Sequence, residues 1–243
     1  MKTVTIIGAS HGVGAAMAAA FHAQDDKVTA VARDAGALRE LAGRLPGITT
    51  LARDARDAGT ATELLHAQPD VVILAAGTAT PNTPFHELDW DRFSQNWNGD
   101  MQMTFHLLKA ALIQPTKPGA VVIVVTSGAG LAGSPISGGY AGAKRMQMFL
   151  AGYAQKEAQR AGRDTRFFGL MPKTIMTQTA FGRAAVDAYL ARLGINEATF
   201  FSGPDARQTP EQVAEAALAL VTNPASYEGV NYIAGATGIT PLV

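Results

Sequence analysis

The sequence predicts an α/β fold in which a doubly wound, parallel sheet of seven strands carries helices on both faces. Three observations predict it: short β-branched apolar runs, helix-period segments between them, and a glycine-rich turn directly after the first run. Strands that alternate with helices along a chain form a parallel sheet whose ligands bind at the carboxyl ends of the strands. We therefore expect a single domain over residues 1–243, with its site at that edge.

Seven runs have the character of strands. Several are apolar at consecutive positions, which is typical of strands that are buried on both faces. In chain order they are TVTIIGA (3–9), KVTAVAR (27–33), ITTLARD (48–54), DVVILAAG (70–77), AVVIVVTS (120–127), RFFGLMP (166–172) and VNYIAG (230–235).

Three segments repeat apolar residues at helical spacing. The last of them begins with a capping box, in which Thr209 caps, Pro210 fits the first helical position and Gln212 completes the box. The apolar positions are Val13, Ala16, Met17, Ala20 and Phe21; Met146, Phe149, Leu150 and Tyr153; and Val213, Ala216, Ala217, Leu220 and Val221.

Composition and charge exclude several classes of function. The formal net charge is zero and like charges do not cluster, so neither nucleic acid nor an anionic membrane is an expected partner. The chain has no cysteine and its five histidines form no close ligand pair, so we expect no metal site. No stretch resembles a membrane span or a signal peptide. We expect a cytoplasmic protein.

The first strand run leads into GASHGVG (8–14), and a helical period follows at once. Glycines at this point let the backbone turn tightly, and they let the N–H groups of the helix N-terminus approach a pyrophosphate. A plain strand-to-helix turn is the alternative. On the cofactor interpretation, the residues of the loop that bind are Gly8, Ser10, His11, Gly12, Val13 and Gly14.

Arg33 directly follows the second strand run. A carboxylate at this place usually holds the ribose of NAD, whereas an arginine suits the extra phosphate of NADP. His11 could assist if it is protonated. The alternatives are that Arg33 is a solvated loop residue and that His11 has no role. We expect NADP as the cofactor, with NADPH preferred over NADH.

The stretch GGYAGAKRMQ (138–147) places Tyr140 and Lys144 four residues apart, on one face of a helix. Such a pair also occurs by chance. Carbonyl reduction needs a neutral acid beside the developing alkoxide, and a nearby ammonium stabilises the phenolate that remains. Ser127, at the end of the fifth strand run, would hold and polarise the substrate oxygen.

Together these motifs resemble the short-chain dehydrogenase/reductase family, in its branch of short subunits with GxxxGxG and YxxxK motifs. The resemblance covers nearly the whole chain and follows the family's order, including the spacing of thirteen residues from Ser127 to Tyr140. It implies a single Rossmann-fold domain in which Ser127, Tyr140, Lys144 and Asn98 are catalytic.

By the resemblance, Lys144 also holds the nicotinamide ribose, and Asn98 supports a water that links Lys144 to a proton relay. A helix-interior amide bonded to backbone is the alternative for Asn98. Asp54 would contact the adenine, or would only cap a turn. The other cofactor contacts that the resemblance implies are Ala76, Gly77, Tyr140, Pro172, Ile175 through its backbone and Thr177 through its hydroxyl.

The sequence departs from the family's pattern at several places. Ile7 replaces a threonine, LAAG (74–77) replaces NNAG, and Lys173 replaces the glycine after Pro172. Lys173 would line the substrate pocket or point to solvent. Gly99 and Asp100 after Asn98 fit a local distortion of the helix there.

The segment 177–206 is expected to form a lid over the substrate. Its aromatic and aliphatic side chains favour a small, mainly apolar substrate. The alternative is that these side chains pack the segment onto the body or onto a neighbouring subunit. They are Phe181, Tyr189, Leu190, Leu193, Phe200 and Phe201.

The sequence therefore predicts an NADP(H)-dependent oxidoreductase, a ketone or aldehyde reductase or an alcohol dehydrogenase, with Tyr140 as general acid/base. A non-catalytic NADP(H) sensor is an alternative. An isomerase or dehalogenase on the same fold is another. The family resemblance implies a homodimer or homotetramer that pairs through the helices around Asn98 and Tyr140.

Overall fold

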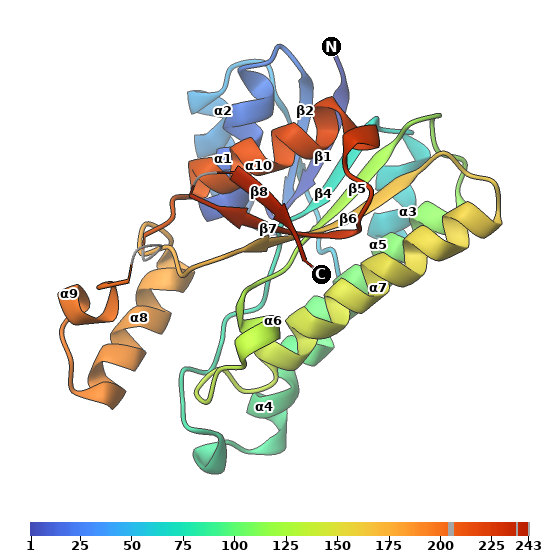
Figure 1. The fold of residues 1–243 in the computed structure, drawn as a ribbon. Coiled ribbons are helices and arrows are strands. Elements are labelled where there is room, and N and C mark those ends of the chain that lie inside the picture. The colour runs from blue at the N-terminus through green and yellow to red at the C-terminus, as the bar shows by residue number, and fades with distance from the viewer. Residues whose placement is uncertain (204–206, 237, 243) are drawn as a thin grey trace.

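A mostly parallel sheet forms the centre of the computed structural model, which describes residues 1–203, 207–236 and 238–242 (Figure 1). The strand order is β3-β2-β1-β4-β5-β6-β7-β8. The strands are β1 (Thr3–Ile7), β2 (Lys27–Ala32), β3 (Thr49–Ala52), β4 (Val71–Leu74), β5 (Val121–Val125), β6 (Arg166–Pro172), β7 (Asn231–Gly235) and β8 (Gly238–Pro241).

The doubly wound α/β fold is confirmed, and β1 to β7 are the seven expected parallel strands. Over the described residues, the structure corrects the number of strands in the sheet to eight. The additional strand, β8, pairs antiparallel with β7, with Gly235 opposite Gly238. A connection this short joins antiparallel neighbours only. The four residues of β8 are too few and too mixed in character to show a strand period in the sequence.

Helices cover both faces of this sheet (Figure 1). They are α1 (Gly12–His22), α2 (Ala35–Arg44), α3 (Ala58–His66), α4 (Trp90–Asn96), α5 (Gln102–Ile113), α6 (Ala129–Ala132), α7 (Tyr140–Arg160), α8 (Ala180–Leu193), α9 (Glu197–Phe200) and α10 (Pro210–Thr222). Short turns of other helix types are η1 (Phe85–Glu87), η2 (Trp97–Met101) and η3 (Pro224–Ser226).

Two hydrophobic cores lie on opposite faces of the sheet. Ile6 packs in the core formed with α1, α2 and α10, whereas its neighbour Ile7 packs in the core formed with α3, α5 and α7. Successive strand residues point to opposite faces, so a strand between two helix layers must be apolar at every position. This double burial explains why the strand runs could be read from the sequence.

The expected capping box at α10 is present. The Thr209 hydroxyl accepts a hydrogen bond from the Gln212 backbone N–H at 3.3 Å, and the Gln212 side chain accepts one from the Thr209 N–H at 2.9 Å. The box fixes the residue at which α10 begins.

The expected distortion near Asn98 is also present. The segment η2, between α4 and α5, is one π-helical turn. Gly99 lies buried in this turn, where a Cβ atom would stand 2.1 Å from the Thr78 Oγ1. The widened turn therefore packs tightly against the loop that follows β4.

The helices α8 and α9 project from the body as an arm (Figure 1). Arg183 of α8 forms ion pairs of 2.7 Å with Asp187 and 2.8 Å with Glu197 of α9, and the rings of Tyr189 and Phe200 are in contact. These contacts join the two helices into one unit. The expected lid is described over residues 177–203, and its last three residues, 204–206, lie outside the described residues.

None of the helices in the described ranges combines the length and the apolar character that crossing a membrane requires.

Gly14 tests how the first helix is held on the first strand. A Cβ atom on Gly14 would lie 2.1 Å from the Gly8 carbonyl oxygen. We expect Gly14→Ala to lower the free energy of unfolding by about 1–3 kcal/mol, because the backbone on both sides must shift. Urea denaturation measures this loss.

The matched control is Gly152→Ala, since Gly152 lies inside α7 with nothing within 4 Å of its Cβ position. This change should stabilise the protein by up to about 1 kcal/mol through helix propensity. Equal stability of the two variants would contradict the close packing of α1 on β1.

Candidate active site

The turn after β1 is built from close backbone contacts. Gly8 has a φ of +88°, and a Cβ atom there would stand 2.4 Å from the Ala76 backbone nitrogen. The Gly8 N–H donates to the Val31 carbonyl at 2.7 Å. The glycine turn is therefore fixed between the ends of β2 and β4, with Ala76 against it and Gly77 next in the chain.

The start of α1 is open to an anion. His11 is the N-cap residue with an extended backbone, and its side chain makes no capping hydrogen bond. The first N–H groups of a helix then lack intrahelical partners and carry the positive end of its dipole. Gly12 has a φ of +55° and keeps this approach free of a side chain. These features fit the pyrophosphate of a nicotinamide dinucleotide.

Two basic side chains, His11 and Arg33, lie near the end of β2. The His11 Nδ1 is 3.1 Å from the Ser10 hydroxyl, and Arg33 is exposed. Asp34 also lies here, and sequence reasoning missed it. Its carboxylate caps α2 by accepting hydrogen bonds from Ala37 and Gly36, and these bonds, with smaller contributions from charges such as His11, lower its pKa.

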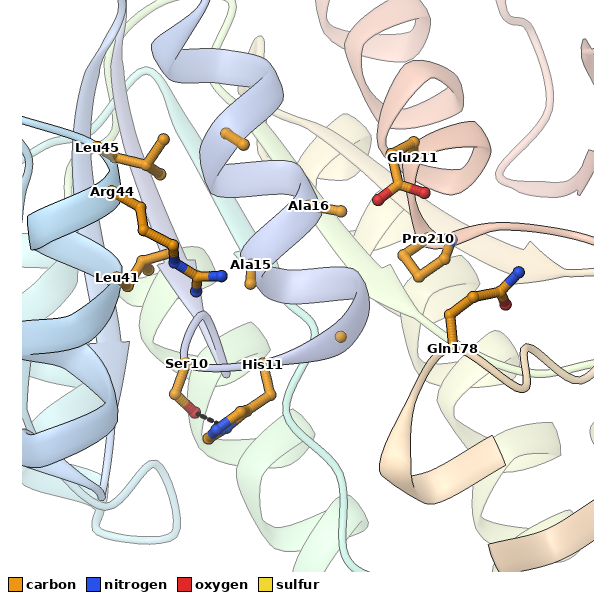
Figure 2. A pocket seen from close by; sticks show the side chains of 12 residues that line it. Ser10, His11, Ala15, Ala16, Leu41, Arg44, Leu45, Gln178, Pro210 and Glu211 are labelled. Carbon is orange, nitrogen blue, oxygen red and sulfur yellow. Dashed lines mark hydrogen bonds between the residues drawn. The ribbon is translucent and has the colours of Figure 1, made fainter. Parts of the chain in front are cut away.

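A cavity of about 380 Å³ lies over the first turns of α1 (Figure 2). Ser10, His11 and Gly12 line it together with Arg44 of α2 and Glu211 of α10. The cavity therefore adjoins the glycine loop, and its lining does not include Tyr140 or Lys144.

The Asp54 carboxylate is paired with the side chain of Arg56. Its two carboxylate oxygens accept hydrogen bonds from the Arg56 guanidinium, the shortest at 2.6 Å, and Oδ1 also accepts from the Arg56 backbone N–H. The Arg56 side chain holds the pKa of Asp54 down to about 2. The carboxylate thus stabilises a turn, and its contact with adenine stays a prediction.

Tyr140 and Lys144 lie one turn apart at the start of α7. The Lys144 Nζ is 5.4 Å from the centre of the Tyr140 ring, and it donates to the Val125 carbonyl at the end of β5 at 3.4 Å. Ser127 follows β5, and the backbone of Gly130 in the next turn packs against the backbone of Lys144. The structure therefore brings the elements that carry Ser127, Tyr140 and Lys144 to one end of the sheet.

Lys144 is paired with a residue that sequence reasoning did not assign to the site. Its Nζ lies 3.4 Å from the Asp100 Oδ2, with the two side chains 5% and 0% exposed. Burial acts to lower the pKa of Lys144, but the charges of Asp100 and Tyr140 outweigh it, so the pKa is raised. Lys144 is therefore a buried ammonium.

Asn98 does not join this group. It is exposed, and its amide donates to the Ser94 hydroxyl one turn earlier at 3.3 Å. The π-helical turn widens the helix here, so the residue that faces α7 is Asp100, two positions further on. The structure therefore does not bring Asn98 into contact with Lys144, and its role in supporting a water that links Lys144 to a proton relay stays a prediction. The only sequence signal was the distortion itself, which does not say which polar residue of NWNGD points inward.

The end of β6 is fixed by a second residue that the sequence did not single out. The buried Gln208 side chain accepts hydrogen bonds from the N–H groups of Lys173 and Thr174, at 3.0 and 3.3 Å. Pro172 accepts from Gly128 at 3.2 Å, which ties this end to the turn after Ser127. Lys173 is exposed, and Ile175 and Thr177 are half-buried in the segment that leads to α8.

The segment predicted to be a lid lies close to Tyr140 and to the glycine loop, and its helix α8 also contacts Ser134. The Phe181 ring centre is 5.4 Å from that of Tyr140, and the Tyr189 hydroxyl is 2.5 Å from the Ser134 hydroxyl. At the start of α8, a Cβ atom on Gly12 would lie 3.2 Å from the Thr179 methyl group. The segment predicted to be a lid thus reaches both the glycine loop and the tyrosine.

Histidine and carboxylate side chains form no cluster of three that could hold a metal ion within the described ranges.

Comparisons with known proteins show the family. The family model described as short chain dehydrogenase matches residues 2–185. The chain belongs to the short-chain dehydrogenase family, whose members are oxidoreductases that use a nicotinamide cofactor. Among proteins of curated function, none matches this sequence.

Solved structures show the same fold. A short-chain dehydrogenase/reductase described as a glucose/ribitol dehydrogenase, from Brucella melitensis, is 23% identical with a TM-score of 0.79, covering 96% of this chain and 94% of its own. Another short chain dehydrogenase/reductase family protein is 21% identical with a TM-score of 0.75, at the same coverage. A protein provisionally described as a betaketoacyl-ACP reductase is 21% identical with a TM-score of 0.74, covering 95% of this chain and 94% of its own.

The Arg56 contact gives a pH-dependent prediction. Because the folded-state pKa of Asp54 is depressed, its pairing stabilises the protein above the ordinary value of 3.8, and this stability is lost as pH falls toward 2. Asp54 is 36% exposed, so solvent screening limits the effect to below about 1 kcal/mol. Arg56→Gln should therefore lower the free energy of unfolding at pH 7 and have little effect at pH 2, measured by urea denaturation. An equal loss at both pH values would contradict the pairing.

Proposed function

We propose that the protein is an NADP(H)-dependent carbonyl reductase, or an alcohol dehydrogenase in the reverse direction, that acts on a small, mainly apolar substrate. The observation that carries this proposal is the start of α7, where a buried, charged Lys144 lies beside the ring of Tyr140. This pair provides an acid whose conjugate base is stabilised by a fixed positive charge.

Each residue has a separate part in the reaction. The nicotinamide cofactor, when bound, supplies the hydride that reaches the carbonyl carbon. The Tyr140 hydroxyl donates its proton to the carbonyl oxygen, which becomes the alcohol, and the Lys144 ammonium stabilises the phenolate until solvent returns a proton. Ser127 donates a hydrogen bond to the same oxygen and orients it. In the alcohol-oxidising direction each step is reversed.

The cofactor would lie along the carboxyl ends of the strands. The amides at the start of α1 hold the pyrophosphate, and Arg33 with His11 binds the extra phosphate of NADP. Asp34 and Arg33 support the preference for NADP. The Asp34 carboxylate accepts the hydrogen bonds that cap α2, whereas the Arg33 side chain remains exposed. Asp54 would contact the adenine, and Ile175 and Thr177 the nicotinamide.

The substrate would bind between Tyr140 and the lid segment. The contact of Phe181 with the Tyr140 ring supports an apolar environment for the carbonyl group. The pairing of Tyr189 with Ser134 would hold the lid near this position. A closed lid would exclude water from the proton donor.

Large apolar side chains on η2, α5 and α7 support a homodimer or homotetramer. Trp97, Phe105, Phe149 and Tyr153 are each about half exposed, at 50%, 49%, 46% and 52%. Exposed apolar patches of this kind mark protein interfaces. A second copy of the chain would cover them.

Tyr140→Phe tests the acid assignment. Removing the hydroxyl should cut carbonyl reduction at least about 100-fold, since general acid catalysis supplies that much or more. Its NADPH affinity should stay close to that of the unchanged protein. Loss of NADPH absorbance with a panel of ketones, and cofactor titration by fluorescence, measure the two quantities.

Tyr153→Phe is the matched control for this experiment, because Tyr153 lies further along the same helix, outside the proposed reaction site, and the change keeps its ring at the proposed interface. It should keep near-normal turnover. If Tyr140→Phe turned over carbonyls as fast as Tyr153→Phe, the acid assignment would be wrong.

Arg33→Asp tests the cofactor preference. Reversing this charge should weaken NADPH binding at least about tenfold and leave NADH binding nearly unchanged, because only NADPH carries the extra phosphate. Isothermal titration with each cofactor measures this difference. Arg160→Asp, at the far end of α7, is the control and should alter neither affinity. Equal weakening of both cofactors by Arg33→Asp would show that Arg33 does not bind the phosphate.

A further inference from the structure

We propose that Asp100 is a positioning residue of the α7 site, whose buried carboxylate holds the Lys144 side chain in place and in its ammonium form beside Tyr140. The consequence for turnover rests on the proposed function, whereas the pairing of Asp100 with Lys144 does not.

The geometry around Asp100 leaves one of its oxygens for the lysine. Its Oδ1 accepts a hydrogen bond from the Thr78 backbone N–H at 2.6 Å. Its Oδ2 is buried, accepts no hydrogen bond from the described residues and lies 3.4 Å from the Lys144 Nζ. A buried carboxylate oxygen without another donor needs a cation, and Lys144 supplies it.

The backbone of Asp100 is fixed as firmly as its side chain. Its carbonyl oxygen accepts hydrogen bonds from the Thr104 hydroxyl at 2.8 Å and from the buried Gln147 amide of α7 at 3.4 Å. Asp100 is therefore held by the loop after β4 through its carboxylate, and by α5 and α7 through its backbone carbonyl. A carboxylate held in this way can fix the position of its partner.

Few other polar groups face the Lys144 ammonium. The phenol of Tyr140 faces it from α7, and the uncharged Val125 carbonyl faces it from the end of β5. The next residue, Arg145, places its guanidinium over the Phe149 ring, which lies half exposed. Asp100, from η2, is thus the group that most strongly offsets the effect of burial on the Lys144 ammonium. Without it, burial would favour the neutral amine.

This pairing has a direct consequence for the proton donor. A neutral amine cannot stabilise the Tyr140 phenolate. Asp100 would therefore set how far into alkaline pH the site keeps its fixed positive charge. An amide at position 100 could keep the hydrogen bond from Thr78, but it could not supply the negative charge.

Asp100→Asn tests the proposal, with Asp91→Asn, an exposed residue of α4, as the control. The readout is the pH titration of the Lys144 ¹³Cε resonance in the full protein, assigned with Lys144→Arg. We expect Asp100→Asn to shift this titration down by roughly one to three pH units, the range for losing an opposite charge at this distance. Asp91→Asn should not shift it. An unchanged titration in Asp100→Asn would overturn the proposal.

The unchanged protein supplies a second test that does not depend on the folding of a variant. Its Lys144 should remain charged beyond the ordinary lysine pKa of about 10.4. Titration well below that value would show that Asp100 does not hold the charge, and would also overturn the proposal.

The pH dependence of carbonyl reduction tests the positioning role of Asp100 separately from the proposed reductase activity. In Asp100→Asn, carbonyl reduction should fall off at lower pH than in the unchanged protein, while the KM for NADPH stays nearly constant. A loss of rate that is equal at every pH would indicate a structural role only and would contradict the positioning role. If the unchanged protein reduces no carbonyl despite binding NADPH, the proposed function fails, and the Lys144 titration still decides the pairing.

Discussion

The buried ion pair between Asp100 and Lys144 is the interaction on which the arrangement of the site depends. It joins the π-helical turn η2, the loop after β4, the end of β5 and the first turn of α7. Replacing such a pair with apolar side chains is often neutral, whereas removing one partner costs about 3–5 kcal/mol, because the other charge stays buried. The pair therefore specifies one arrangement of these four segments more than it adds net stability.

Close backbone packing imposes the second constraint, on the cofactor side of the sheet. Gly8 lies against Ala76 and Gly14 against Gly8, so β1, α1 and the loop after β4 approach one another without intervening side chains. The same loop after β4 continues to Thr78, which contacts Asp100. The cofactor loop and the ion pair are thus connected through one short segment.

Much of the fold could be predicted from the sequence because its causes are local or periodic. Burial on both faces makes the strands apolar at every position, and the capping box of Thr209 and Gln212 marks a helix start. The strand β8 escaped prediction, since four mixed residues carry no period.

The candidate site was predictable where it depends on spacing along one helix, as for Tyr140 and Lys144. It was not predictable in η2. There the helical period changes, and which residue of NWNGD faces inward depends on packing against Thr78 and α7, so Asp100 and not Asn98 meets the lysine. Gln208 escaped notice for a similar reason, because its contacts with Lys173 and Thr174 join segments that are distant in the sequence.

A double-mutant cycle on the ion pair tests the central claim most directly. It compares the free energies of unfolding of Asp100→Asn, Lys144→Met and the double variant with that of the unchanged protein. If the pair organises the site, the double variant loses less stability than the sum of the two single losses, by at least about 1 kcal/mol. Losses that add within about 0.5 kcal/mol would contradict the account, since the two side chains would then act independently.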